Sequence, residues 1–531
     1  MKYILYVVLV CFILTDSIFA DDLPDIIGFF EAEDGSWGRD FVAIDANGDR
    51  FDDLLICSRE SYGGQIYFGR QRMSQFEPDL WISSRFENQL PCINVEYIGR
   101  MLPDQNPVVV IFHQILGLNN LETCMLDYWI IKDNFEDEPD YFQSRQYNEY
   151  PYLYTPDGFR NKPADVNDDG YNDFVTFSSV DSNGTGFFQI FYGGEEFDTI
   201  PDWSVYIDST GMMASTKYST GFDINHDNYD DVIYRIYLQQ SQHYWYMLYL
   251  GGSPMDTLPA YCLQGDSLTG PDSCVAWMQN GFSMFPDVNG DGYDDWGAGF
   301  VGRLNGGRRY SGFAIFFGGE QPDAEPDLFL EGSRIDREDV MDITGGDFND
   351  DGYGDIATTM GTATPPAGEV QIHMGSRWID ETADIFINLG RHYNGQYFTY
   401  PERIGAVGDY NGDSCDDFVV EGSWRLIIFG GKAEWVSGVN DDANPVDFRI
   451  EFTASPNPFN SQVEISYSLI SDNRVMVDIY DIQGRHLDNL ANGLQVQGDH
   501  TLTWSNRNAG LYFVRLKFGE SVSYKKVVCL P

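Results

Sequence analysis

The chain has 531 residues, of which 83 are Asp or Glu and 32 are Lys or Arg, so its formal net charge at pH 7 is −51. So acidic a surface repels phosphate backbones, which excludes nucleic-acid binding and disfavours docking onto anionic lipid. Hydrophobic residues make up 43% of the chain and aromatic residues 15%, so the acidity does not indicate disorder. The length predicts more than one domain.

The first twenty residues have the pattern of a secretory signal peptide. Lys2 supplies a positive charge, residues 4–14 are apolar, and Ala20 is a small residue suited to cleavage. The apolar run is too short for a transmembrane helix, which needs about 20 residues, and no later segment is suited to one. We therefore expect export of the chain and removal of residues 1–20.

Export would bring the cysteines into a compartment where disulfides form. After loss of Cys11 seven cysteines remain, an odd number. Cys262 and Cys274 are one candidate pair, and Cys92 and Cys124 are another. The sequence alone does not determine the pairing.

An Asp-rich loop of nine residues recurs six times, with side-chain oxygens at positions 1, 3, 5 and 9. The copies start at Asp45, Asp165, Asp223, Asp287, Asp347 and Asp409. Successive starts differ by 120, 58, 64, 60 and 62 residues. The first gap is twice the others, and residues 104–108 at its midpoint read as a degenerate copy without acidic ligands. We therefore expect seven repeats with six acidic loops.

Each repeat also carries an apolar strand that ends in Gly-Gly or a remnant of it, followed by a Pro-Asp step and a further apolar run. Alternating polarity and β-branched and aromatic residues favour four short strands per repeat. Such repeats predict the blades of a β-propeller, and an open array of β-sandwich modules is the alternative. The last repeat lacks its Pro-Asp strand, while a spare copy stands at residues 24–30. We expect that N-terminal strand to close the ring, which leaves no free edge.

The loop oxygens predict a cage for a hard cation. Ca²⁺ accepts six to eight oxygen ligands, and a backbone carbonyl at position 7 would add one, whereas Mg²⁺ demands tighter geometry. The alternative is a set of solvated Asp/Asn turns, but three or four carboxylates crowded in each loop would repel one another without a cation. We therefore expect up to six Ca²⁺. The expected ligands are Asp45, Asn47, Asp49, Asp53, Asp165, Asn167, Asp169, Asp173, Asp223, Asn225, Asp227, Asp231, Asp287, Asn289, Asp291, Asp295, Asp347, Asn349, Asp351, Asp355, Asp409, Asn411, Asp413 and Asp417.

The loops that start at Asp165, Asp287 and Asp347 have Gly at position 6, where a sharp turn needs backbone freedom. The other loops have Arg, Asn or Ser there. We expect the three Gly-containing loops to bind calcium most tightly.

The DxNxDxxxD loops, each followed by apolar residues such as Leu54 and Leu55, resemble the FG-GAP/VCBS repeats of integrin-α-like β-propellers. The resemblance covers roughly residues 25–431. It implies calcium-stabilised blades used in extracellular recognition. The missing loop in the second repeat and the non-Gly residues at position 6 depart from the family pattern.

Residues 439–447 read as a polar linker, after which the pattern changes to that of a small immunoglobulin-like β-sandwich at residues 448–531. Pro-Asn-Pro-Phe-Asn at 456–460, Tyr-Asp-x-x-Gly-Arg at 480–485 and Gly-x-Tyr-Phe-Val at 510–514 resemble the type A C-terminal sorting domain of the type IX secretion system. The resemblance implies export across the outer membrane by that machinery. A generic immunoglobulin-like sandwich is the alternative.

These features predict an all-β protein: a seven-bladed propeller at residues 21–438, closed by an N-terminal strand, plus the C-terminal sandwich. We expect a secreted or outer cell-surface protein that mediates recognition or adhesion with a protein or glycan ligand. Aromatic loops at 147–154 and 393–400 are candidate contact surfaces, with packing between blades as the alternative. Without HExxH or GxSxG we expect no enzyme. A carbohydrate-active enzyme and a structural envelope component are the alternatives.

Overall fold

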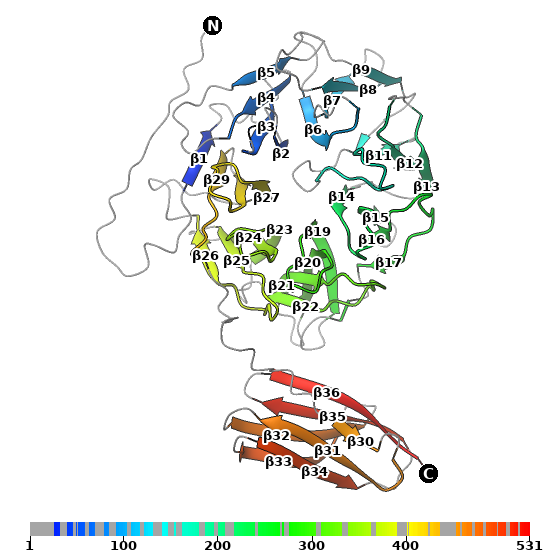
Figure 1. Ribbon diagram of the computed structural model, residues 1–531, viewed down its shortest axis with the longest axis vertical. Helices are drawn as coiled ribbons and strands as arrows, with labels where there is room; N and C mark the ends of the chain where they lie inside the picture. The colour runs from blue at the N-terminus through cyan, green and yellow to red at the C-terminus, as the bar shows by residue number, and fades with distance from the viewer. Residues whose placement is uncertain are drawn as a thin grey trace, which may run out of the picture. The chain divides into compact units, whose positions relative to one another are not determined.

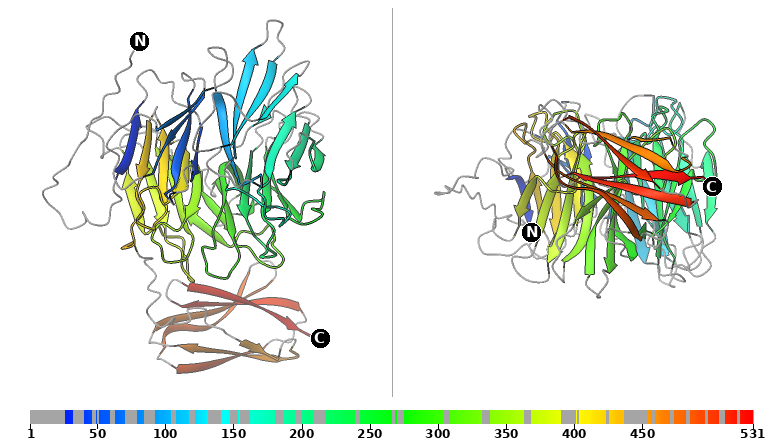
Figure 2. Two further views of the ribbon diagram at one scale, coloured as in Figure 1. Left: turned by 45° about the horizontal axis from the view of Figure 1, so that its top comes forward. Right: turned by 90° about the horizontal axis from the view of Figure 1, so that it is seen from below.

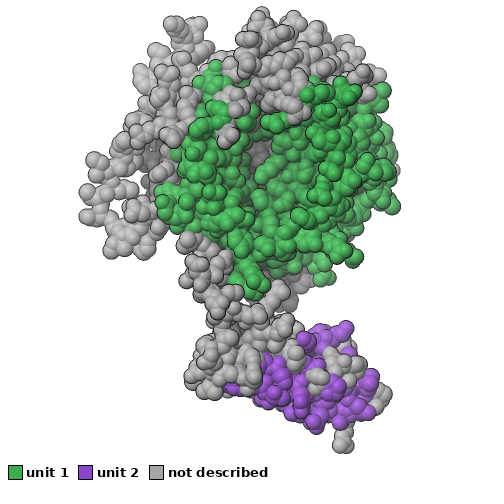
Figure 3. Space-filling view, viewed as in Figure 1, with its two compact units in different colours: residues 1–439 green, residues 440–531 purple. Residues whose placement is uncertain are grey.

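The computed structural model of the chain divides into two compact units, residues 1–439 and 440–531 (Figure 3). The structure describes residues 26–31, 40–45, 49, 51–58, 63–69, 79–83, 92–103, 108–116, 122–130, 141–146, 153–154, 162–179, 186–195, 200–207, 217–238, 243–265, 268–269, 275–303, 309–331, 338–362, 368–389, 401, 403–422, 425–435, 453–456, 459–469, 473–481, 485–495, 498–505, 510–518 and 521–530. These residues form strands and no helix, which confirms the expected all-β class. Accordingly, no helix in this described part could cross a membrane.

In the first unit seven antiparallel sheets stand around a common centre (Figure 1). Six of them follow the chain in order. The first is β2 (Asp40–Ile44), β3 (Asp53–Ser58), β4 (Gly63–Tyr67) and β5 (Leu80–Ser83); the second β6 (Cys92–Gly99), β7 (Val108–Leu116), β8 (Glu122–Ile130) and β9 (Tyr141–Gln146); the third β10 (Leu153–Tyr154), β11 (Phe174–Ser179), β12 (Gly186–Phe191) and β13 (Trp203–Ile207). The fourth is β14 (Lys217–Phe222), β15 (Asp231–Leu238), β16 (His243–Tyr249) and β17 (Tyr261–Gln264); the fifth β18 (Leu268–Thr269), β19 (Val275–Phe285), β20 (Asp295–Arg303), β21 (Arg309–Phe316) and β22 (Leu328–Glu331); the sixth β23 (Glu338–Gly346), β24 (Asp355–Thr362), β25 (Glu369–His373) and β26 (Ile385–Asn388).

The seventh sheet joins the two ends of this unit. Its strand order is β1-β29-β28-β27, with β27 at Arg403–Gly408, β28 at Asp417–Gly422 and β29 at Arg425–Phe429. β1 (Ile26–Glu31) pairs antiparallel with β29, so that Phe29 lies opposite Ile427. β27 in turn contacts β2 of the first sheet. The seventh sheet therefore lies beside the first.

Each sheet repeats one path from the centre outwards, seen from further sides in Figure 2. An inner strand leads into the nine-residue loop, the next two strands form a hairpin, and a last strand lies at the outside. The fifth sheet adds β18 before its inner strand, and the outer strand of the seventh sheet is β1. β12, a middle strand, is buried almost throughout, whereas the outer β13 alternates between buried and exposed residues. This difference explains why the middle strands read as continuous apolar runs.

Neighbouring sheets pack face to face through large side chains. Phe188 stacks on Tyr234 of the next sheet with ring centroids 4.4 Å apart. The last and first sheets share a core in the same way, because Phe41 and Tyr67 pack in one cluster with Val419. Burial of aromatic and aliphatic surface between sheets thus stabilises this unit.

The second unit is a sandwich of two antiparallel sheets. One sheet holds β30 (Thr453–Ser455), β31 (Gln462–Leu469) and β34 (Gly498–Ser505); the other holds β33 (His486–Gln495), β32 (Asn473–Asp481), β35 (Gly510–Phe518) and β36 (Ser521–Cys529) in that order. Phe459 is 1% exposed, packs edge-on against Trp504, and forms a parallel bridge with Cys529. The N–H of Leu530 donates to the carbonyl of Phe459 at 2.7 Å. Phe459 therefore ties the start of the module to its last residues, and Cys529 is part of the core.

The structure bears on both candidate cysteine pairs. Cys262, on β17, is a free and exposed thiol, and Cys274 lies outside the described residues. Cys92 and Cys124 lie on β6 and β8 with β7 between them. Two inter-strand spacings put their Cα atoms about 9–10 Å apart, beyond the roughly 7 Å that a disulfide bridges.

Several sequence expectations fall outside the described residues: the signal peptide at 1–20, the linker at 439–447, the aromatic loop at 393–400, and all but Leu153 and Tyr154 of the loop at 147–154.

Candidate metal-binding loops and the C-terminal module

The five Asp-rich loops from Asp165 onwards follow one hydrogen-bonding scheme. In the loop that starts at Asp165, Oδ1 of this residue accepts the N–H of Asp169 at 3.1 Å and Oδ2 accepts that of Gly170 at 2.8 Å. At position 5, Asp169 accepts the N–H of Tyr171 at 2.9 Å. The four later loops repeat these bonds. Positions 1 and 5 therefore fold the loop by capping its own backbone.

Position 3 carries an amide whose orientation is set by position 5. Asn167 donates through Nδ2 to Asp169 at 3.0 Å, and three other loops repeat this bond. In the loops at 165, 287 and 347 the amide oxygen accepts the N–H of position 5, at 2.9 to 3.2 Å. At Asn225 no donor among the described residues reaches this oxygen, although it is buried. The loop at 409 differs, because Asn411 donates to Asp417 at 3.2 Å instead.

Position 9 is the most buried part of each loop. Asp173 accepts the N–H of Val166 on one oxygen and that of Gly193 on the other, both at 2.9 Å. The later loops repeat both bonds, and Asp53 accepts the N–H of Gly69. All six position-9 carboxylates are at most 4% exposed. Each of them joins its own loop to the end of the third strand of its sheet.

The same contact explains the Gly at the end of the third strand. A Cβ atom on Gly193 would lie 2.4 Å from the carbonyl oxygen of Asn172, and a Cβ on Gly318 would lie 2.2 Å from that of Asp294. Only Gly lets the backbone approach this closely while its N–H reaches the position-9 carboxylate.

The backbone of the loops turns through the left-handed region at position 6. Gly170, Gly292 and Gly352 have φ of +87°, +92° and +89°, and Asn228 and Ser414 have +69° and +78°. The expected sharp turn is present in all five loops, at a cost where the residue is not Gly. Arg50, at this position of the first loop, lies outside the described residues, as does Asn47.

Position 8, which the sequence analysis did not single out, joins each loop to the preceding sheet. The N–H of Asp165 donates to Oδ2 of Asp230 at 2.7 Å, and the N–H of Asp230 donates to the carbonyl of Asp165 at 3.1 Å. The last and first loops are joined likewise, since Asp409 and Asp52 exchange the same two bonds at 3.1 Å. We call this pair of bonds the position-8 clasp. Its sequence signal is the polar residue next to position 9, but its partner lies 65 to 357 residues away.

The degenerate loop of the second sheet lies in a different register from the one expected at residues 104–108. β6 ends at Gly99 and β7 begins at Val108, so the nine positions are 100–108. Arg100 takes position 1, and its N–H donates to Oδ1 of Asn172 at 2.8 Å. The N–H of Asn172 donates back to the carbonyl of Arg100 at 3.1 Å. The clasp thus persists here with an amide in place of a carboxylate.

Burial dominates the electrostatics of the loops. Loss of solvent raises the pKa of Asp173 and Asp417 to about 8, despite the backbone N–H bonds that oppose the shift. At position 8, burial and neighbouring carboxylates raise the pKa of Asp52 to about 6, and burial that of Asp230 to about 6. The loops therefore hold carboxylates whose charged form is disfavoured unless a cation compensates it.

The types of oxygen ligand in the loops fit a hard cation, although the loops do not form a preformed cage. Each loop brings together carboxylate, amide and backbone carbonyl oxygens, the ligands that Ca²⁺ prefers. The buried Oδ1 of Asn225, which accepts no hydrogen bond from the described residues, lies at an expected ligand position. Among the described residues no group of three or more Asp, Glu, His or Cys side chains is arranged to hold a metal as it stands. The carboxylates are instead turned to backbone N–H groups.

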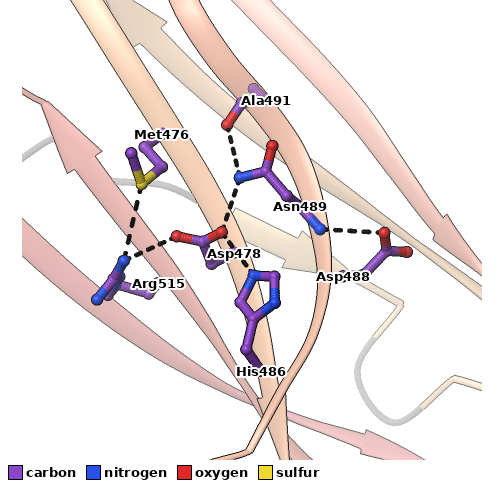
Figure 4. A network of polar contacts seen from close by, with 7 residues as sticks. All are labelled: Met476, Asp478, His486, Asp488, Asn489, Ala491 and Arg515. Atoms are coloured by element: carbon purple, nitrogen blue, oxygen red, sulfur yellow. Dashed lines mark hydrogen bonds and ion pairs between the residues drawn. The ribbon is translucent and has the colours of Figure 1, made fainter.

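The C-terminal module buries a carboxylate in another way (Figure 4). Asp478, on β32, is 3% exposed and accepts hydrogen bonds from Arg515 at 2.8 Å and from Asn489 at 2.7 Å. His486 Nε2 lies 2.8 Å from the same carboxylate, and the Arg515 guanidinium lies over the ring of Tyr480. Burial alone would raise the pKa of Asp478, but these three partners hold it below its usual value. This network has no local signal in the sequence, because its members come together only when β32, β33 and β35 pair.

Comparison with known proteins identifies this module. Residues 454–529 match the family described as the secretion system C-terminal sorting domain. The match confirms the sorting-domain assignment made from the sequence and supports export by the type IX system to the cell surface or the medium. No curated protein matches the chain significantly.

Among solved structures, one similar chain is described as the structure of the Dos1 propeller. The alignment covers 77% of this chain and 95% of that chain, at 10% identity and a TM-score of 0.31. A TM-score this low adds nothing to the arrangement of sheets described above.

Proposed function

We propose that the chain is a calcium-stabilised, seven-bladed β-propeller of the FG-GAP/VCBS type that recognises a protein or glycan outside the cell. Each sheet of residues 26–435 is one blade, and β1 completes the last blade and closes the ring. The observation that carries the proposal is the recurrence of one Asp-rich loop, between the inner strand and the next, in six of seven sheets.

Calcium would be held by the side-chain oxygens at positions 1, 3, 5 and 9. When bound, it would neutralise carboxylates that burial otherwise pushes towards their protonated form. The chain's own contribution is to fold the loop through backbone N–H groups and to hold the position-3 amide beside position 5. The loop at 409, whose amide donates to position 9, supports weaker binding there.

Thermal unfolding of the full chain with calcium and with a chelator tests the metal assignment. A ligand at 100 times its Kd stabilises the folded state by about 2.7 kcal/mol per site. We expect the transition of the propeller to move to a much lower temperature in chelator, while that of the sorting module stays unchanged. Equal transitions of the propeller in both conditions would contradict calcium binding.

Recognition is tested by probing glycan and protein arrays with the calcium-saturated chain. Binding to a defined class of glycan or protein is the expected result. A polysaccharide panel incubated with the same protein serves as the control for catalysis. Turnover of a polysaccharide at saturating calcium would replace the recognition proposal with that of an enzyme.

Export is tested by deleting residues 448–531 and following the propeller in cell fractions. We expect the truncated chain to remain in the periplasm, because the module that matches the sorting family is gone. Appearance of the truncated propeller at the cell surface would contradict type IX export.

A further inference from the structure

The position-8 clasp links acidic loops that belong to neighbouring sheets. Asp230 holds both backbone groups of Asp165, and it directly precedes Asp231, the position-9 residue of its own loop. A change in the backbone at position 1 of one loop is therefore transmitted to position 9 of the next loop through one peptide unit.

A carboxylate makes this clasp at four junctions. They join the loops at 165 and 223 through Asp230, at 223 and 287 through Asp294, at 347 and 409 through Asp416, and at 409 and 45 through Asp52. The N···O distances of the two bonds lie between 2.7 and 3.3 Å.

The chain of clasps is interrupted at two places. Position 8 of the loop at 347 is Gly354, which has no side chain, so only its N–H reaches the carbonyl of Asp287, at 2.7 Å. Between the loops at 45 and 165 stands the second sheet, whose loop has Arg100 at position 1 and no acidic ligand set. The six acidic loops thus fall into two groups of three: those at 165, 223 and 287, and those at 347, 409 and 45.

We propose that calcium binding is coupled within each of these groups and independent between them. The inference rests on the proposed calcium binding and adds its regulation. Calcium that orders one loop would fix the backbone of its position 1, and through the clasp it would pre-order position 9 of the following loop. The next ion then binds with less ordering cost, which is positive cooperativity.

The backbone alone does not create this division. The carbonyl at position 2 of the loop at 287 accepts the N–H of Ser376 at 3.0 Å, and the equivalent bond at the loop at 165 comes from Gly252 at 2.7 Å. Both kinds of junction therefore keep their backbone bonds. The difference between them is the carboxylate at position 8, which is the group to test.

Amide hydrogen exchange of the full chain, followed by mass spectrometry during a calcium titration, reads each loop separately. The variant Asp169→Ala removes an exposed ligand from the loop at 165. We expect the calcium midpoint of the neighbouring loop at 223 to rise roughly fivefold or more, while the loops at 347, 409 and 45 keep theirs. Unchanged midpoints at 223, or equal shifts at all five remaining loops, would overturn the grouping.

A matched pair at position 8 identifies the route of coupling. Asp230→Ala removes the acceptor, whereas Asp230→Asn keeps one, as Asn172 does for Arg100 at 2.8 Å. Combined with Asp230→Ala, Asp169→Ala should no longer shift the calcium midpoint of the loop at 223. Combined with Asp230→Asn, it should still shift that midpoint. Identical behaviour of the two variants would exclude the clasp as the route. Absence of any calcium-dependent protection in the unmodified chain would instead refute calcium binding itself, so the two failures are distinguishable.

Discussion

The two units of this protein handle the buried carboxylate in opposite ways. Residues 448–531 contain eight Lys plus Arg and eight Asp plus Glu, so the whole net charge of −51 lies in residues 1–447. In the first unit a buried Asp is surrounded by backbone N–H groups and by other carboxylates. In the second, Asp478 has an Arg, an Asn and a His around it.

The pKa values of these groups differ in direction accordingly. Burial raises the pKa of Asp173 to about 8, because two N–H bonds do not offset the loss of solvent and the neighbouring charges. The pKa of Asp478 is lowered, since charged and polar donors outweigh its burial. Burial by itself therefore does not set the pKa of a carboxylate, because the charges and donors around it can outweigh the loss of solvent. At Asp173 the charged form is disfavoured, whereas at Asp478 it is favoured.

The largest expected effect comes from removing a position-9 carboxylate. Asp295 is fully buried and accepts two N–H bonds of 2.8 Å. Asp295→Ala leaves both donors unsatisfied, and we expect a loss of roughly 3–5 kcal/mol in the free energy of unfolding of the first unit. Urea unfolding without calcium measures it.

Asp291→Ala, in the same loop but exposed, is the control and should cost much less in the absence of calcium. An equal loss in both variants would mean that the two N–H bonds to the buried carboxylate do not stabilise the fold of the first unit.

A Cβ atom at the end of the third strand should be nearly as harmful. Gly318→Ala would bring Cβ to 2.2 Å from the carbonyl oxygen of Asp294 and displace the N–H that Asp295 accepts. We expect a loss of roughly 2–4 kcal/mol, as for other backbone clashes in packed regions. The adjacent Gly319→Ala meets nothing within 4 Å and should be close to neutral. A neutral Gly318→Ala in thermal unfolding would contradict the close approach.

In the second unit the corresponding test is Asp478→Ala, which leaves the Arg515 guanidinium without its buried partner. Because Arg515 is partly exposed, we expect a loss of roughly 2–3 kcal/mol, below that of a fully buried pair. The loss should be the same with and without calcium. Arg515→Met provides the second arm of a double-mutant cycle, and additive losses would show that the pair is not coupled.

The contribution of Asp478 also depends on pH. Its pKa is lower in the folded than in the unfolded state, so its stabilisation is present above the unfolded value of about 4 and is lost as pH falls through the folded value. Urea denaturation of the second unit between about pH 3 and about pH 7 measures this effect. We expect the fall in the free energy of unfolding towards low pH to be absent in Asp478→Asn. A slope that the variant retains would assign the acid sensitivity to another group.

The smallest expected effect is a gain. Ser414 has φ of +78°, a conformation that costs a residue with a side chain, whereas the equivalent loops at 165, 287 and 347 have Gly. Ser414→Gly should stabilise the first unit by up to about 1 kcal/mol. Gly292→Ala, at the same position of another loop, should destabilise it by a similar amount. Destabilisation by Ser414→Gly, or stabilisation by Gly292→Ala, in calorimetry would show that position 6 is not under backbone strain.

Much of this protein could be predicted from the sequence because its signals are local. The nine-residue loop, the Gly-Gly strand end and the Pro-Asp step repeat within about sixty residues, and they led to all-β sheets arranged in repeats. The sorting module was recognisable from short motifs between residues 456 and 528 and is confirmed by its family match. The calcium ligands, the adhesive function and the absence of catalysis stay predictions.

Only the tertiary structure could decide how the repeats are joined. The register of the degenerate loop depends on Arg100 meeting Asn172, 72 residues away, and the junction of last and first sheets depends on Asp409 meeting Asp52, 357 residues away. The same holds for Cys529, whose place in the core follows from its bridge to Phe459. The sequence determined which residues form each loop and strand, since turn chemistry and polarity act between near neighbours. The tertiary structure determined which carboxylate is buried at position 9, which forms a position-8 clasp and which pairs with an Arg. Hydrogen-bond partners and burial arise only when distant segments pack together.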